Sequence, residues 1–116
     1  MFLHLAHTQK PVFEASRKFT LECYRLTKDF PPDERFAMTQ QIRRTALSTY
    51  LNIAEGCSRK SETERKRFFE VSRGSLIEVD AAIDIACELD YKTKEQLQQL
   101  GEYIVSTFKQ LTGLIR

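Results

Sequence analysis

Apolar residues recur at steps of three and four residues along four segments of the chain, which is the spacing of one face of an α-helix. The apolar face of the first predicted helix consists of Val12, Ala15, Phe19, Cys23, Leu26 and Phe30, and that of the second consists of Met38, Ile42, Ala46, Thr49 and Ile53. The third comprises Phe68, Ser72, Ser75, Val79, Ile83 and Ala86, and the fourth comprises Leu97, Leu100, Ile104, Phe108, Leu111 and Ile115. The sequence has no strand-like alternation of any length, so its regular structure is predicted to be helical.

Proline and glycine indicate where the predicted helices begin and end. Pro11 suits the first position of a helix, whereas Pro31 and Pro32 interrupt the apolar pattern between the first helix and the second. Gly56 is predicted to adopt the left-handed conformation that commonly ends a helix. We therefore assign residues 11–116 to one helical domain and residues 1–10 to an N-terminal tail.

Two capping boxes mark the starts of the third and fourth helices. Ser61-Glu62-Thr63-Glu64 and Thr93-Lys94-Glu95-Gln96 each place a hydroxyl and a carboxylate or amide three residues apart, where both can bond free backbone N–H groups. The connections between the four apolar patterns are short, so consecutive helices are expected to be antiparallel neighbours. The predicted fold is all-α, an antiparallel up-down-up-down four-helix bundle.

Two of the predicted helices carry more apolar surface than one bundle core requires. On the third helix, Val71, Gly74, Ala81 and Ile85 run along a flank that also carries Arg67 and Glu78. On the second, the residues outside the main apolar face are Phe36, Leu47, Tyr50, Leu51 and Ala54. A helix in a single bundle buries an arc of about 100° or somewhat more. The surplus apolar surface, with small residues that allow close approach, predicts a homo-oligomer.

Composition and charge place the chain among soluble cytoplasmic proteins. Of its 116 residues 41% are hydrophobic and 29% are charged, and the formal net charge is only +2. Three cysteines with no CxxC spacing fit a reducing compartment better than a disulfide scaffold. No apolar run approaches the roughly 20 residues of a membrane span, so no membrane association is expected.

A polar line follows the second predicted helix, through Gln41, Arg44, Ser48, Asn52 and Glu55. Asn52 and Glu55 lie one turn apart and could act together as ligands or as an acid–base pair. The favoured alternative is a polar seam that fixes register or oligomeric state by pairing with Arg67 or Glu78. The residues predicted for this seam and the oligomer interface are Asn52, Glu55, Arg67, Gly74, Glu78, Ala81 and Ile85. No catalytic residue is assigned, and the protein is not expected to be an enzyme.

Metal and nucleophile chemistry have little support in the sequence. A di-iron site in a helical bundle needs Glu-x-x-His pairs on facing helices. The only histidines are His4 and His7, which precede the first helix and could chelate a metal only weakly. Cys57 follows Gly56 at a predicted helix end, but no histidine stands beside it as a base. We therefore expect neither a metal nor a cofactor.

Basic residues concentrate between positions 43 and 73, where they outnumber acidic residues two to one. Part of this charge can pair on a solvated helix face, as Glu62 with Lys66 and Lys66 with Glu70. The candidate nucleic-acid contacts are Arg43, Arg44, Arg59, Lys60 and Arg65, of which the last three have the fewest expected partners. Non-specific contact with RNA or DNA is the first hypothesis, and sequence-specific base reading has no support. Aromatic residues for base stacking are few, because Phe68 is expected in the core and Phe69 on the flank.

Three motifs carry a resemblance to a known family: QIRR at Gln41 to Arg44, NIAEG at Asn52 to Gly56, and GSLIE at Gly74 to Glu78. With the segments around them they resemble the four-helix bundle protein family over roughly Val12 to the C-terminus. That family includes proteins encoded within intervening sequences of bacterial 23S ribosomal RNA genes. It also includes the accessory variability proteins of diversity-generating retroelements. Phe13 stands where the family more often has tryptophan, which keeps an aromatic side chain there.

The resemblance implies a ring of bundles, typically a pentamer, with no known catalytic activity. For the retroelement members it implies partnership with nucleic acid and with a reverse transcriptase. Those members are more basic than this chain. The expected function is thus a non-enzymatic, ring-forming homo-oligomer that makes weak, non-specific nucleic-acid contacts. The alternative is an adaptor for a protein partner, such as a reverse transcriptase, with a docking surface that includes Ile77, Leu114, Phe2, Leu3 and Leu5.

Overall fold

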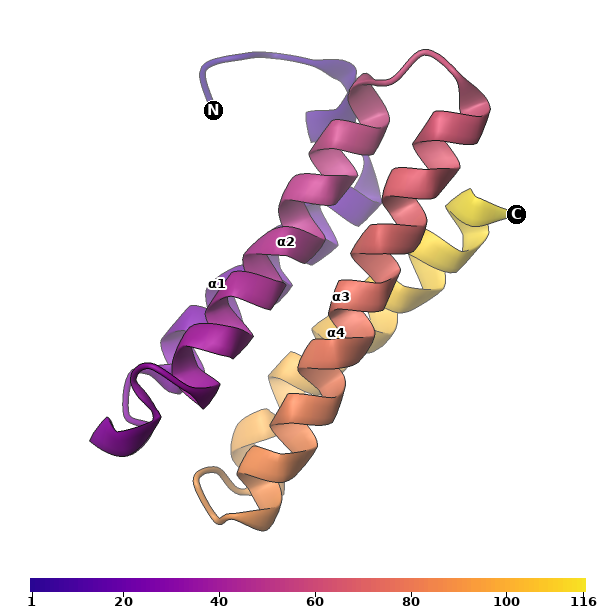
Figure 1. Cartoon of the computed structure of the whole chain (residues 1–116). Coiled ribbons are helices and arrows are strands. Elements are labelled where there is room, and N and C mark those ends of the chain that lie inside the picture. Colours follow the sequence, from indigo (N-terminus) through magenta and orange to yellow (C-terminus); the bar gives the residue numbers. More distant parts are fainter.

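Four long α-helices run alternately up and down the molecule (Figure 1). The computed structural model describes the backbone of residues 1–116 and every side chain except that of His7. The long helices are α1 (Pro11–Thr27), α2 (Met38–Ser58), α3 (Glu62–Glu88) and α4 (Lys94–Ile115). Two short 3-10 helices, η1 (Ala6–Gln9) and η2 (Pro32–Glu34), precede α1 and α2 respectively. The predicted all-α, up-down-up-down bundle is confirmed.

Each long helix packs against two others, α1 and α3 each lying between α2 and α4. The most extensive of these contacts joins α2 to α3. The N-terminal segment crosses the end of the bundle where α2 passes into α3, and η1 contacts both α1 and α2 there (Figure 1). Part of the predicted N-terminal tail is therefore packed on the bundle. None of the described helices combines the length and apolar character that a membrane span needs.

The core is built largely from the predicted apolar faces, although on α3 and α4 a neighbouring residue takes the place of a predicted one. On α3 the prediction placed Phe68 in the core, but Phe69 is only 5% exposed and Phe68 is half-buried. On α4 the predicted Phe108 is 39% exposed, and Thr107 beside it is fully buried. Thr107 can occupy the core because its hydroxyl donates to the carbonyl oxygen of Tyr103 at 2.7 Å. On both helices the side chain that enters the core belongs to the residue next to the predicted one.

Gly56 does not end α2 in a left-handed conformation, so that prediction is wrong. The helix continues to Ser58, and Gly56 is buried within it with no positive φ. A Cβ atom at this position would lie 2.8 Å from ring carbon Cε1 of Phe69. Gly56 is therefore required by the close approach of α2 and α3. The left-handed residue among those described is Asp90, with φ 63°, in the turn between α3 and α4.

The predicted caps are present at both helix starts, one of them complete. Thr93 and Gln96 make the reciprocal pair of bonds, Gln96 N–H to Thr93 Oγ1 at 3.2 Å and Thr93 N–H to Gln96 Oε1 at 2.9 Å. At α3 the Glu64 N–H donates to Ser61 Oγ at 3.3 Å. Phe36, predicted on the second helix, lies just before α2 and is largely exposed. The turn between α2 and α3 is therefore anchored by a cap on its α3 side.

Candidate nucleic-acid interface

The turn between α2 and α3 holds three of the five predicted nucleic-acid contacts. Arg59 follows the last residue of α2 in an extended conformation, and its N–H donates to the carbonyl oxygen of Gly56 at 3.2 Å. Ser61 then caps α3, and Arg65 lies in the first turns of that helix. The turn therefore brings Arg59, Lys60 and Arg65 to one end of the bundle.

Arg59 is held by contacts on both sides of its guanidinium group. It forms an ion pair with Glu55 one turn earlier in α2, and its guanidinium carbon lies 4.9 Å from the centre of the Phe68 ring. Its Nε is buried and lacks a hydrogen-bond partner among the described residues. Arg65 in turn donates from Nε to the carbonyl oxygen of Arg59 at 2.6 Å. The sequence suggested that both arginines have few partners. These contacts show instead that each is held by neighbouring groups.

Lys60 is the exposed cation at the tip of the turn. Lys66, two turns further on, is 3.7 Å from Glu62, so the predicted pairing of these two residues is confirmed. That pair lies at the surface, where ion pairs contribute little to stability. The turn therefore presents two arginines held by contacts within the chain beside an exposed lysine, a combination suited to phosphate oxygens.

Arg43 and Arg44 lie apart from this turn. Arg44 precedes Arg59 by 15 positions, or about 22 Å along a helix. Arg43 faces α1, where it donates to Thr27 Oγ1 at 2.8 Å and to the carbonyl oxygen of Tyr24 at 3.2 Å, and its guanidinium lies over the Tyr24 ring. Arg44 is exposed and borders a polar hollow between α2 and α3. The five predicted contacts thus do not form one continuous patch.

The polar line on α2 is organised by bonds along and between helices. Asn52 Nδ2 donates to the carbonyl oxygen and to Oγ of Ser48, at 2.9 and 3.1 Å, and Ser48 Oγ lies 3.1 Å from Ser75 Oγ on α3. Glu55 is directed to Arg59 instead. Asn52 and Glu55 therefore have separate partners, and the predicted pairing of this line with Arg67 or Glu78 stays a prediction.

The predicted flank of α3 is exposed along its length. Val71, Gly74, Ala81 and Ile85 are all exposed, as are Arg67 and Glu78 between them. Arg67 and Glu78 are three turns apart on the same helix, so they cannot pair within one chain. Glu78 borders the polar hollow that Gln41, Arg44 and Ser48 also line. The seam and the flank thus share the outer face formed by α2 and α3.

Cys57 lies in a second hollow, near the end of α2. Burial raises the pKa of its thiol, an effect that the charges of Lys10 and Arg65 oppose more weakly. The neutral thiol is therefore favoured, whereas a nucleophile needs the thiolate. Among the described side chains no three potential metal ligands come together, and the weak chelation considered for His4 and His7 involves the undescribed His7 side chain.

The sequence analysis did not identify two basic residues that line this hollow, Lys10 and Lys66, as candidate site residues. Lys10 is remote in sequence from the basic region, and only the packing of α1 against the end of α2 brings it there. Lys66 was assigned wholly to ion pairs with its helix neighbours. The spacing of Glu62, Arg65, Lys66 and Phe69 was the available signal, because such residues share one side of a helix.

Comparison with solved structures supports the fold. A crystal structure described as a protein of unknown function from the S23 ribosomal protein family, from Bacteroides thetaiotaomicron VPI-5482, matches 90% of this chain and 98% of its own. The two are 20% identical, with a TM-score of 0.81, a likeness that establishes the shared fold alone. No curated protein sequence matches significantly.

The family assignment comes from the sequence profile. A family model described as 23S rRNA-intervening sequence protein matches residues 8–113, which is nearly the whole bundle. The match includes all three motifs that carried the resemblance and all four long helices, apart from the last residues of α4. The chain therefore belongs to the 23S rRNA-intervening sequence protein family.

Proposed function

We propose that the protein is a non-catalytic, ring-forming homo-oligomer that makes weak, non-specific contacts with nucleic acid. Assembly would use the exposed outer face of α2 and α3, and nucleic acid would meet the turn between these helices. Each subunit contributes only a few cations. Repetition of the turn around the ring converts weak contacts into useful avidity.

The observation that carries the proposal is the small-residue flank of α3. A Cβ added to Gly74 would meet no other atom within 4 Å, as at Gly101 and Gly113, so the isolated chain has no packing need for glycine there. Gly74 differs from those two in lying on the exposed apolar flank of α3. Glycine inside a helix costs about 1 kcal/mol relative to alanine. A contact with a second copy accounts for that cost, since Gly74 and the exposed Ala81 allow a neighbouring helix to approach closely.

A second exposed apolar surface favours a ring over a dimer. Leu21, Tyr24, Leu47 and Tyr50 line an apolar groove between α1 and α2, on a different face from the α3 flank. Contact between two different surfaces is heterologous, and such contacts close into rings when the rotation between subunits permits. The family resemblance leads us to expect five subunits.

The basic turn supports the nucleic-acid part of the proposal. Arg59 and Arg65 are fixed by their contacts, and Lys60 extends from the turn. Phosphate contacts of this kind carry no sequence information, which agrees with the non-specific binding proposed here. The binding constant for such contacts falls steeply as the salt concentration rises. On a log–log plot the magnitude of the slope is close to the number of phosphates contacted.

Light scattering tests the assembly directly. The wild type is expected to have a mass of several subunits, and Gly74→Gln is expected to be monomeric, because the larger side chain blocks close approach. Gly113→Gln is the matched control, since a Cβ there also meets no atom within 4 Å. A monomeric wild type, or an oligomer unaffected by Gly74→Gln, would contradict this interface.

The same samples, mixed with a short duplex and a single-stranded oligonucleotide across a salt series, test the second part. Salt-sensitive binding that is stronger for the oligomer than for the Gly74→Gln monomer is expected. An oligomer that binds neither probe at low salt would leave the assembly and reject the nucleic-acid contact.

One observation favours an adaptor as the second candidate function. Ile77, Val105 and Phe108 are exposed together on the α3–α4 face, around a shallow apolar groove away from the α3 flank. Of the other residues predicted for partner docking, Phe2, Leu3 and Leu5 are exposed and Leu114 is half-buried. Replacement of Val105 by Glu would abolish capture of a protein partner without changing the oligomeric mass. Loss of assembly in that variant would assign the groove to the ring instead.

A further inference from the structure

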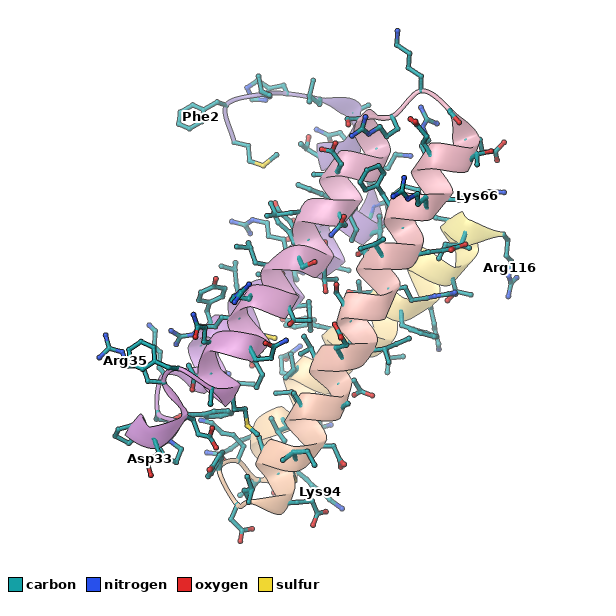
Figure 2. All side chains as sticks on the ribbon, in the orientation of Figure 1. Phe2, Asp33, Arg35, Lys66, Lys94 and Arg116 are labelled. Carbon is teal, nitrogen blue, oxygen red and sulfur yellow. The ribbon has the colours of Figure 1, made fainter. Side chains whose placement is uncertain are left out.

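The hollow beside Cys57 lies at one end of the bundle, where residues of all four long helices or next to them border it together with Ala6 of η1. Lys10 lies at the start of α1, Cys57 near the end of α2, Lys66 in the first turns of α3, and Leu114 near the end of α4 (Figure 2 labels Lys66). Its volume is about 370 Å³. A site assembled from four helices is positioned by the whole bundle rather than by one flexible segment.

Its polar wall comes largely from one side of α3. Glu62, Arg65, Lys66 and Phe69 follow at the i, i+3, i+4 and i+7 positions and all line the hollow. They lie near the N-terminal end of a long helix, whose dipole favours anions close to its first turn. Lys10 adds a cation from α1. The hollow therefore has cations from two helices that are far apart in sequence.

The charge of this wall is matched to a dianion. Lys10, Arg65 and Lys66 contribute three positive charges and Glu62 one negative charge, which leaves a net charge of +2. Lys66 is only loosely held by Glu62, at 3.7 Å. A phosphate monoester carries about −1.5 to −2 at pH 7, whereas each phosphodiester in a nucleic-acid strand carries −1.

The remaining lining is apolar. Phe69 and Leu114 face the hollow beside the Cys57 thiol, whose pKa is raised by burial and lowered by the charges of Lys10 and Arg65. Both cations therefore act on the position that Cys57 occupies. The hollow thus joins a cationic rim to an apolar wall, which suits a phosphate attached to a carbon skeleton better than a bare inorganic anion.

We infer that this hollow binds a phosphate monoester, with the phosphate among Lys10, Arg65 and Lys66 and the attached sugar or ring against Phe69 and Leu114. The group can belong to a free nucleotide or to the phosphorylated end of a strand. The inference does not depend on the proposed ring or on binding along a strand, although Arg65 serves both sites.

Titration calorimetry with a nucleoside 5′-monophosphate and the matching nucleoside tests the inference. The monophosphate is expected to bind at least about tenfold more tightly, and Lys10→Gln or Lys66→Gln should each weaken it about tenfold. Lys18→Gln is the matched control, because Lys18 is an exposed lysine on α1 that does not line the hollow. No preference for the phosphate, or an equal loss in Lys18→Gln, would overturn the site.

Oligonucleotides with and without a 5′-phosphate separate the two sources of the group. A preference for the phosphorylated end, lost in Lys10→Gln, supports recognition of strand ends. Binding of the mononucleotide with no such preference assigns the site to free nucleotides. Salt-sensitive binding that ignores the 5′-phosphate, with no mononucleotide binding, would retain the proposed strand contact and reject the hollow.

Cys57 supplies an independent reading of occupancy. Alkylation of Cys57, followed by peptide mass spectrometry, should slow at saturating monophosphate, while alkylation of the half-buried Cys87 remains unchanged as the internal control. Equal protection of both cysteines would indicate general stabilisation and contradict binding at this hollow.

Discussion

The ring of Phe69 occupies the space that a side chain at Gly56 would need. A Cβ built on Gly56 lies 2.8 Å from Cε1 and 3.1 Å from Cδ1 of that ring, and 3.1 Å from Cβ of Phe68. Phe69 is itself buried against the core and cannot move aside without disturbing it. This contact sets the spacing of α2 and α3 next to the basic turn.

Gly56→Ala is therefore expected to destabilise the fold, by about 1–3 kcal/mol, because overpacking outweighs the better helix propensity of alanine. Gly101→Ala is the control, since a Cβ there meets nothing within 4 Å. That control should be stabilised by up to about 1 kcal/mol. Urea unfolding of both variants gives the comparison, and an equally stable Gly56→Ala would contradict the packing role.

Arg59→Gln combined with Lys60→Gln should weaken nucleic-acid binding without changing the oligomeric mass. Removal of two cations is expected to lower the salt dependence on duplex DNA by about 0.9 in log–log slope for each phosphate that the variant no longer binds. Lys18→Gln with Lys28→Gln removes the same charge from exposed positions on and just after α1. If both double variants lose equal affinity, net charge rather than the turn governs binding.

Arg67→Ala and Glu78→Ala should each impair assembly, because both residues lie on the exposed flank of α3. The two are too far apart on the helix to form an ion pair with each other within one chain. The expected result is a lower mass, or dissociation at a higher protein concentration, in light scattering. Lys18→Ala and Glu95→Ala change exposed charges elsewhere and serve as controls. A mass unaffected by either flank variant would remove these residues from the interface.

Arg43→Ala should reduce stability and leave nucleic-acid binding unchanged. The guanidinium bonds Thr27 and Tyr24 on α1 and lies 5.2 Å from the centre of the Tyr24 ring, so its loss should cost about 1–2 kcal/mol. Arg44→Ala, at an exposed neighbouring position, should stay within about 0.5 kcal/mol of the wild type. A large affinity loss in Arg43→Ala at unchanged stability would return Arg43 to the nucleic-acid surface.

Acid should weaken the contact between Asp29 and Lys92, whose side chains meet at 2.6 Å. The hydrogen bond from Lys92 is the main cause that lowers the pKa of Asp29. The stability from this pair is complete above the ordinary pKa of aspartate, near 3.9, and is lost as the pH falls through the lower folded value.

Asp29→Asn should thus lower stability at pH 7 and flatten the loss of stability below pH 4. Lys92 is 7% exposed and would be left buried without this partner. Asp84→Asn, at an exposed position on α3, is the control and should change neither the stability at pH 7 nor its acid dependence. Thermal melts between pH 2 and 7 distinguish the two variants.

The sequence predicted the number of helices, their order and most of their buried faces, because each of these is written in local periodicity. The apolar spacing from Val12 to Phe30 and the Thr93–Gln96 capping box needed no information from the rest of the chain. The exchange of Phe68 for Phe69 marks the limit of such reasoning. Periodicity defines an arc, and only the neighbouring helix selects which residue within that arc points inward.

The basic region shows the same division more sharply. The sequence alone shows which basic residues this region contains. In the structure Arg43 bonds to α1, whereas Arg59, Lys60 and Arg65 lie together at the turn. This separation depends on which helix each residue faces.

The sequence by itself determined an all-α bundle with surplus apolar and basic surface, since helix propensity, capping and apolar spacing act over a few residues. Only the tertiary structure shows that residue 56 must be glycine, because the Phe69 ring fills the space beside it. Only the tertiary structure brings Lys10 next to Cys57 and Lys66. Contacts between residues distant in the chain depend on how whole helices pack, and no local pattern encodes that packing.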